Sequence, residues 1–130
     1  MLAVWKEWNL HEILRNAYEK GIVMSGVSAG AICWFEKGIT DSYAEELAII
    51  ECLGIVKGIS CPHFDEEKER EPYVYDVINR EIIKSCICIE GNCALHVKNN
   101  VDYSSIDFGN GRKCFRVFKE NNTLKKEIIL

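Results

Sequence analysis

Hydrophobic positions recur at two different periods along this chain, first at helical spacing and later at every second residue. In the first part, apolar residues three and four positions apart predict amphipathic helices, and short apolar runs between them predict buried strands. Asn9 and Glu12 have the residue types of a capping box at a helix start, and Gly21 is a typical helix end. The expected helices are residues 10–20, 29–35 and 71–84, and the expected strands are residues 22–26 and 58–61.

From Ser85 onward the period changes to two, which predicts strands joined by turns at Asn92 and at Gly109-Asn110-Gly111. These strands are expected at residues 86–89, 94–98, 113–119 and 123–129. The run from Ala44 to Val56 fits a helix, a strand or one of each. Alternating helices and strands followed by a strand-rich C-terminal part predict an α/β fold with a mainly parallel sheet and flanking helices.

Length and charge narrow the class of protein further. The 130 residues are expected to form one domain, residues 1–130. The chain carries 16 basic and 20 acidic side chains, a net charge of −4. Nucleic-acid binding needs clustered positive charge, so no nucleic-acid partner is expected. The apolar runs are also too short to cross a bilayer, so no membrane partner is expected.

The seven cysteines lie mostly among aliphatic residues, where a free thiol behaves as a small apolar side chain. Cys86, Cys88 and Cys93 come nearest to a metal pattern, but no second cysteine pair or histidine pair accompanies them. No metal site and no organic cofactor are therefore expected. Free thiols and the lack of a signal peptide predict a reducing, cytoplasmic location.

The strongest chemical motif is Gly26-Val27-Ser28-Ala29-Gly30, a G-x-S-x-G sequence between an expected strand and an expected helix. That context is typical of a nucleophile elbow, in which small residues flank a serine on a tight turn. Ser28 is the predicted nucleophile, and the Ala29 N–H at the helix start is the predicted oxyanion donor.

A serine nucleophile needs a base, and the chain has three histidines. His11 is expected on the surface of the first helix, and His96 within a strand. His63 directly follows an expected strand, as Ser28 does, and sites in open α/β sheets form at the carboxyl ends of strands. His63 is therefore the predicted base.

The carboxylate that orients the base is less determined by the sequence. Glu90 follows the strand at residues 86–89 and is the first candidate; Asp41, in the loop after the serine helix, is the alternative. Asp65 and Glu66 are closer to His63 in sequence, but they open a charged run that is expected to be solvated.

These motifs together resemble the peptidase E family of serine dipeptidases. The resemblance rests on Gly26–Ala31, on Cys61–Asp65 with Arg70, and on Ile89–Leu95. It implies a fold similar to class I glutamine amidotransferases, Ser28 as nucleophile, His63 as base, and small peptides with an N-terminal aspartate as substrates. It further implies that Arg70 binds the aspartate side chain of the substrate, for which a guanidinium is well suited.

The N-terminal part of the chain differs from the pattern of this family. Relatives carry several strands and helices before the part that this chain resembles, including a turn that supplies a second oxyanion donor. The chain is therefore expected to be a truncated or split member, able to form homo-oligomers through the sheet edge left bare. Two further hypotheses stay open: a catalytically impaired remnant that acts as a binding or assembly module, and an acyl hydrolase with another substrate, such as a cyanophycinase.

Overall fold

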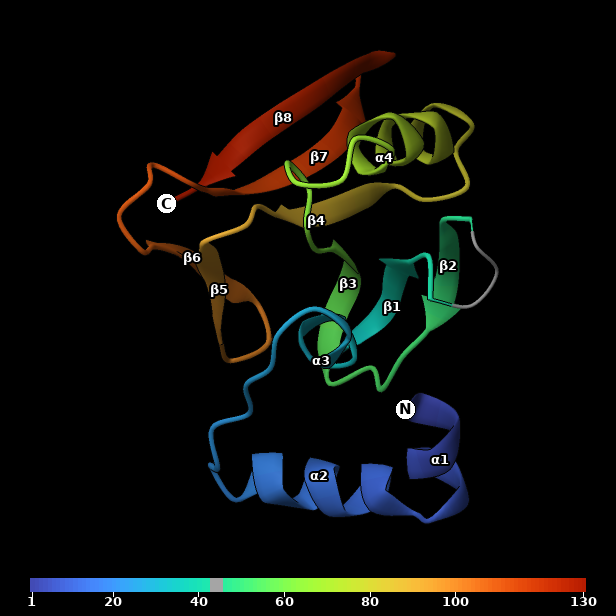
Figure 1. Cartoon of the computed structure of the whole chain (residues 1–130), viewed down its shortest axis with the longest axis vertical. Coiled ribbons are helices and arrows are strands. Elements are labelled where there is room, and N and C mark those ends of the chain that lie inside the picture. Colours follow the sequence, from blue (N-terminus) through green and yellow to red (C-terminus); the bar gives the residue numbers. More distant parts are fainter. Residues whose placement is uncertain (43–45) are drawn as a thin grey trace.

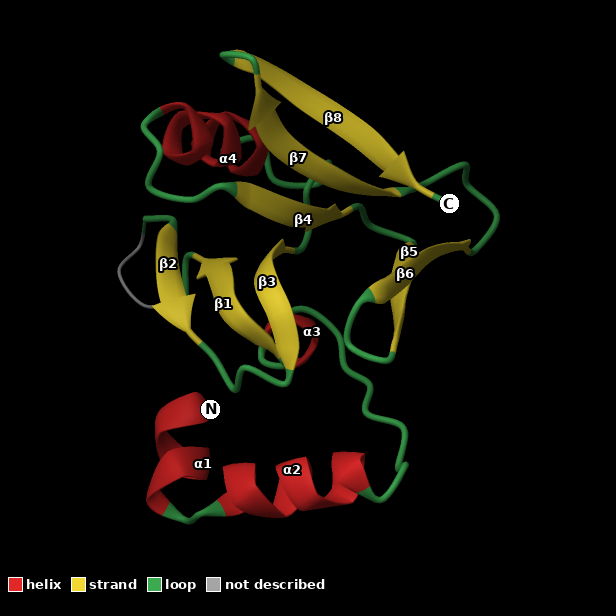
Figure 2. Ribbon diagram, turned by 180° about the vertical axis from the view of Figure 1, so that it is seen from behind, coloured by secondary structure: helices red, strands yellow, loops and turns green. Residues whose placement is uncertain are grey.

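The computed structural model describes residues 1–42 and 46–130 and shows a sheet with helices at one end and on one face (Figures 1 and 2). The helices are α1 (Leu2–Glu7), α2 (Leu10–Glu19), α3 (Ala29–Ile32) and α4 (Arg70–Asn79). The strands are β1 (Phe35–Thr40), β2 (Ala48–Glu51), β3 (Val56–Cys61), β4 (Ser85–Ile89), β5 (Cys93–Lys98), β6 (Asp102–Asp107), β7 (Cys114–Glu120) and β8 (Thr123–Ile129). In this part of the chain, no helix is both long and apolar enough to cross a membrane.

The main sheet has six strands in the order β2-β1-β3-β4-β7-β8. β3 pairs in parallel with β1 and β4, whereas β2, β7 and β8 all join antiparallel. The predicted α/β class is confirmed, but the sheet is mixed and its parallel part is limited to three central strands. β2 and β8 follow short connections, and a short connection cannot make the crossover that parallel pairing needs. β7 follows β4 only after β5 and β6, and it also joins antiparallel.

The two faces of the sheet are covered differently. Val74, Val77 and Ile78 of α4 are buried against one face, together with Ile39 and Val117 of the sheet. On the other face, a separate ribbon of β5 and β6 packs its apolar side chains against Phe35, Val56 and Ile87. β4 therefore runs through the middle of the core.

The segment from residue 22 to residue 26 is the clearest error of the sequence prediction. It was expected to be a buried strand, but it forms no strand, and the Val23 side chain is 89% exposed. A strand needs a neighbour to satisfy its backbone N–H and C=O groups, and no described strand lies beside this segment.

Other predicted boundaries also shift. The helix expected over residues 29–35 ends at Ile32, because Phe35 begins strand β1 and is buried in the sheet. The helix expected over residues 71–84 ends at Asn79, and Glu81 beyond it has a positive φ of 59°. Asn9 has a left-handed backbone and makes no side-chain cap, so the capping box is wrong.

Strands β1 and β6 were missed, as was helix α1. β1 begins at Phe35, where only the end of a helix was expected. β6 was not expected, since its sequence is mostly polar and lacks an alternating pattern. β2 falls in the ambiguous run after residue 44, part of which lies outside the described residues.

Burial of the free thiols makes stability sensitive to alkaline pH. Burial raises the pKa of Cys33, Cys61 and Cys114 from 9.0 to about 12, and that of Cys52 to about 11. The unfolded chain releases these protons near pH 9 and the folded chain does not. The raised pKa values therefore add to the free energy of unfolding. This contribution is complete below pH 9 and falls as the pH rises toward 12, by about 1.4 kcal/mol per thiol and pH unit.

The free energy of unfolding in urea, measured under reducing conditions at pH 8, 9 and 10, is expected to fall only above pH 9. The Cys52→Ala variant should show a shallower decline, because it has one fewer buried thiol. A free energy that stays constant up to pH 10 would contradict this expectation.

Candidate active site

Ser28 lies on a strained turn directly before α3. Its φ of 54° and ψ of −118° are rare for a residue with a side chain. Gly26 makes the turn possible, since a Cβ there would lie 2.0 Å from the carbonyl oxygen of Gly30. The Ser28 side chain is exposed, and within the described residues the Ala29 N–H has no hydrogen-bond acceptor. The turn thus presents a hydroxyl and a free N–H side by side.

His63 follows β3 and reaches the serine. Its Nε2 lies 3.0 Å from Ser28 Oγ, within hydrogen-bond distance, and the imidazole side chain is 30% exposed. His63 also has a positive φ of 54°, so the backbone turns sharply where β3 ends. The structure therefore brings together the predicted nucleophile and base, although only His63 follows a strand.

The carboxylate in contact with His63 is Glu66. Its Oε2 lies 2.6 Å from His63 Nδ1, and its side chain is 47% exposed. The Glu66 N–H donates to the His63 carbonyl at 3.1 Å, so both residues belong to one turn between β3 and α4. Glu66 had been set aside as part of a solvated charged run. The signal that could have found it is its spacing of three residues from His63, which places both side chains on one face of a turn.

The two carboxylates expected near His63 have other partners. Glu90 Oε2 accepts a hydrogen bond from the Lys113 N–H at 3.0 Å, and Asp41 Oδ1 lies 3.5 Å from Arg70 Nη2. Among the described residues, neither carboxylate contacts His63. Glu90 binds the Lys113 N–H because β7 pairs with β4 and brings the Lys113 backbone beside it.

Arg70 is the buried cation of this region. Its side chain is 3% exposed, its Nε donates to Glu67 Oε2 at 2.6 Å, and its Nη1 donates to the Ile39 carbonyl at 3.1 Å. Burial works to lower the pKa of the guanidinium, but its contacts with Glu67 and Cys61 raise the pKa above the ordinary value. Arg70 therefore stays charged. Within the described residues, its Nη2 has a longer contact, with Asp41.

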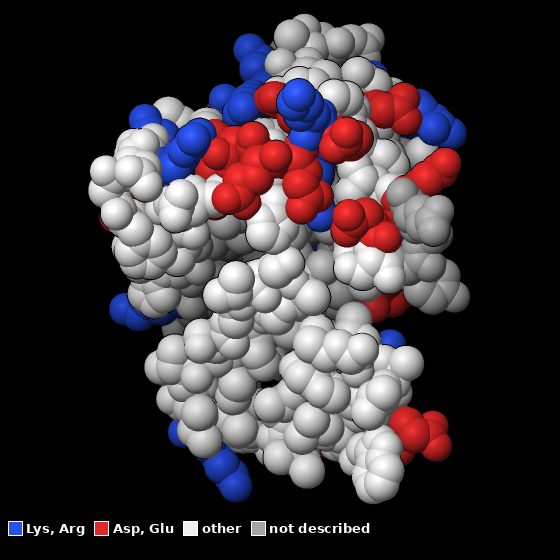
Figure 3. Space-filling model, in the orientation of Figure 1, with Lys and Arg blue, Asp and Glu red and all other residues white. Residues whose placement is uncertain are grey.

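The charge around the site is acidic. Acidic side chains gather on the face shown in Figure 3, over the segment that joins β3 to α4. Within the described residues, no group of three or more His, Cys, Asp or Glu side chains is arranged to hold a metal ion. The other two histidines lie apart: His11 contacts Trp5 and Glu12, and His96 contacts Ser104.

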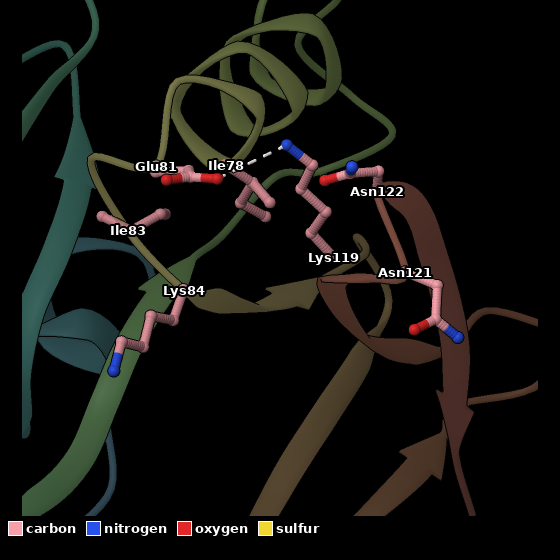
Figure 4. A pocket seen from close by; sticks show the side chains of 7 residues that line it. All are labelled: Ile78, Glu81, Ile83, Lys84, Lys119, Asn121 and Asn122. Carbon is pink, nitrogen blue, oxygen red and sulfur yellow. Dashed lines mark ion pairs between the residues drawn. The ribbon is translucent and has the colours of Figure 1, made fainter.

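A hollow of about 580 Å³ lies at the opposite end of α4 from Glu66 and His63 (Figure 4). Its lining includes Ile78 after the middle of α4, and the Lys119 ammonium, which pairs with Glu81 at 3.7 Å. The candidate site lies at the carboxyl ends of β3 and β4, whereas this hollow lies where β4 begins. The two places are therefore separate.

Comparisons with known proteins show the family of this chain. The model of peptidase family S51 matches residues 1–102. The chain is also 42% identical over 117 residues to the uncharacterized peptidase YgaJ of Bacillus subtilis strain 168, over 90% of this chain and 50% of that relative. The chain belongs to peptidase family S51, the peptidase E family. It spans about half the length of this curated relative.

Proposed function

We propose that this chain is a serine-type dipeptidase that hydrolyses small peptides with an N-terminal aspartate. The observation that carries the proposal is the contact chain from Ser28 Oγ to His63 Nε2, at 3.0 Å, and from His63 Nδ1 to Glu66 Oε2, at 2.6 Å. A hydroxyl, an imidazole and a carboxylate in this order are the parts of a serine hydrolase triad. In this proposal Glu66 takes the role that was predicted for Glu90 or Asp41.

The proposed reaction has two steps. The Ser28 oxygen attacks the peptide carbonyl carbon while His63 Nε2 takes its proton, and the Ala29 N–H stabilises the oxyanion. The C–N bond then breaks, and His63 returns the proton to the leaving amine, which leaves an acyl-enzyme. Water attacks this ester with His63 again as base, and the acid product and free Ser28 are restored. Glu66 keeps the Nδ1 proton on His63 and stabilises the imidazolium in both steps.

Arg70 is the proposed recognition group for the aspartate side chain. Because Nε and Nη1 are already bound, the substrate carboxylate would take the place of Asp41 at Nη2. The Asp41 contact is the longest of the three and is partly exposed, so it is the one that a substrate can displace.

The test of this specificity compares aspartyl p-nitroanilide with alanyl p-nitroanilide as substrates. Asp41→Asn is expected to lower KM about three- to tenfold for the aspartyl substrate only, because it removes the competing carboxylate. Arg70→Ala is expected to reduce kcat/KM about 10- to 100-fold for the aspartyl substrate and much less for the alanyl one. Equal effects on both substrates would reject the aspartate specificity and leave Arg70 a structural role.

One observation supports the alternative proposal, a non-catalytic binding or assembly module. Val23 and Val27 are both strongly exposed beside Ser28, and exposed apolar side chains are typical of surfaces that meet another chain. A second copy of this chain is the proposed partner, and the reducing cytoplasm the proposed location. A folded chain without turnover would favour this second function.

A further inference from the structure

Two free thiols lie beside each other where the ribbon of β5 and β6 joins the main sheet. Cys93 is the first residue of β5 and Cys114 is the first residue of β7. Their Sγ atoms are 3.6 Å apart. Because the sulfurs of a disulfide are about 2.05 Å apart, an approach of about 1.5 Å would bring them to bonding distance. A movement of the two side chains is enough for such an approach.

The backbone around both thiols is held by three strands. Cys114 lies opposite Ile89 in the pairing of β4 with β7, and the Glu90 N–H donates to the Lys113 carbonyl at 3.3 Å. The Cys114 N–H donates to Ser105 Oγ of β6 at 3.0 Å. β4, β6 and β7 therefore meet at this point, and the folded chain keeps the two thiols side by side.

The two thiols differ in their access to solvent. Of the seven cysteines, Cys93 is the one that is not buried, whereas Cys114 is 0% exposed. A small molecule from solvent therefore reaches Cys93 first. Burial raises the pKa of Cys93, although its contacts with Cys114 and with the Glu90 carbonyl lower it in part. Since the thiolate is the reactive form, reaction at Cys93 should become faster as the pH rises.

We propose that Cys93 and Cys114 form a reversible disulfide when the chain meets a small disulfide such as oxidised glutathione. The Cys93 thiolate attacks one sulfur of oxidised glutathione, the S–S bond of the reagent breaks, and one glutathione thiolate leaves. The Cys114 thiolate then attacks Cys93 Sγ, and the second glutathione leaves as a thiolate. Two cysteines are oxidised and one glutathione disulfide is reduced to two thiols, which take up the two protons that the cysteines release.

The new bond would tie the ribbon to the main sheet. The ribbon is joined to the sheet by its connections to β4 and β7, and by apolar packing against Phe35, Val56 and Ile87 (Figures 1 and 2). A bond between residues 93 and 114 closes a loop that contains the whole ribbon. Such a cross-link restricts the unfolded chain, so the Tm is expected to rise by about 5–10 °C. The proposal does not depend on the serine site, since neither thiol belongs to it.

The experiment treats the purified chain with excess oxidised glutathione at pH 8. Remaining thiols are then alkylated under denaturing conditions, and the peptides are mapped by mass spectrometry without reduction. We expect a pair of peptides linked through Cys93 and Cys114, with the other five cysteines alkylated. Dithiothreitol should separate the pair and return the Tm to its starting value. The rate of bond formation should rise about tenfold from pH 7 to pH 8, because the thiolate fraction does.

Three variants test the order of the two steps. Cys114→Ser should keep one glutathione bound to Cys93, because the second attacking thiol is missing. Cys93→Ser should take up no glutathione, because its remaining thiols are buried. Cys52→Ala is the matched control: it also loses a buried thiol, but it should form the bond and show the same rise in Tm.

The following results would overturn the proposal. Cys93 could stay free after the treatment, or the unaltered chain could keep glutathione on Cys93, which would show that Cys114 does not reach it. A disulfide between other cysteines, or a Tm that does not rise when the bond forms, would also contradict it. If Cys114→Ser fails to fold, the peptide map and the Tm of the unaltered chain still decide. None of these measurements needs peptidase activity, so they stand apart from the test of the proposed function.

Discussion

Replacing Ser28 with alanine is expected to lower kcat for aspartyl p-nitroanilide about 10⁶-fold, the loss typical of removing a serine nucleophile from a complete site. The physical reason is that, among the described residues, Ser28 is the hydroxyl in contact with the His63 imidazole. Ser28 lies on the strained turn with its hydroxyl 3.0 Å from His63 Nε2. The alanine variant keeps the Cβ and should fold as the unaltered chain does.

The matched control is Ser25→Ala, which removes a hydroxyl from the same exposed segment three residues earlier. Ser25 makes no side-chain hydrogen bond within the described residues, so its loss should leave kcat within about twofold. Turnover that survives in Ser28→Ala, or that is lost equally in both variants, would exclude Ser28 as the nucleophile.

Replacing Glu66 with glutamine is expected to lower kcat about 10⁴-fold, the second largest effect. Glutamine keeps the size of the side chain but removes the charge, and its NH₂ group would donate to Nδ1 and so favour the wrong tautomer of His63. The measurement is kcat at pH 7 for Glu66→Gln, with Glu69→Gln as control. Glu69 is exposed, and within the described residues its side chain makes no hydrogen bond or ion pair.

The same assay decides between Glu66 and Glu90. Because Glu90 is bound to Lys113 and not to His63, Glu90→Gln is expected to lower kcat no more than about tenfold, through the turn it supports. A 10⁴-fold loss in Glu90→Gln with nearly full activity in Glu66→Gln would return the role to Glu90.

The sequence was informative where chemistry depends on position along a strand. Ser28 and His63 could be placed from the motif and from the strand before His63, and the structure puts them in contact. β8 was predicted with its observed bounds, and β7 to within one residue at each end, because alternating apolar residues set the period of a strand.

The sequence was less informative about which partner a side chain binds when several are possible. Glu90 and Glu66 both lie near strand ends, and only the pairing of β4 with β7 brings the Lys113 backbone to Glu90. The apolar run at residues 22–26 has the composition of a buried strand, but composition does not supply the neighbouring strand that would pair with it.

The central claim is that His63 activates Ser28, and labelling with a fluorophosphonate tests it most directly. The reagent bonds only to an activated serine, and mass spectrometry then identifies the labelled peptide. We expect one label per folded chain, on Ser28, with labelling lost in Ser28→Ala and slowed at least about 10²-fold in His63→Ala. A folded chain that takes up no label, or takes it up at the same rate without His63, would contradict the claim.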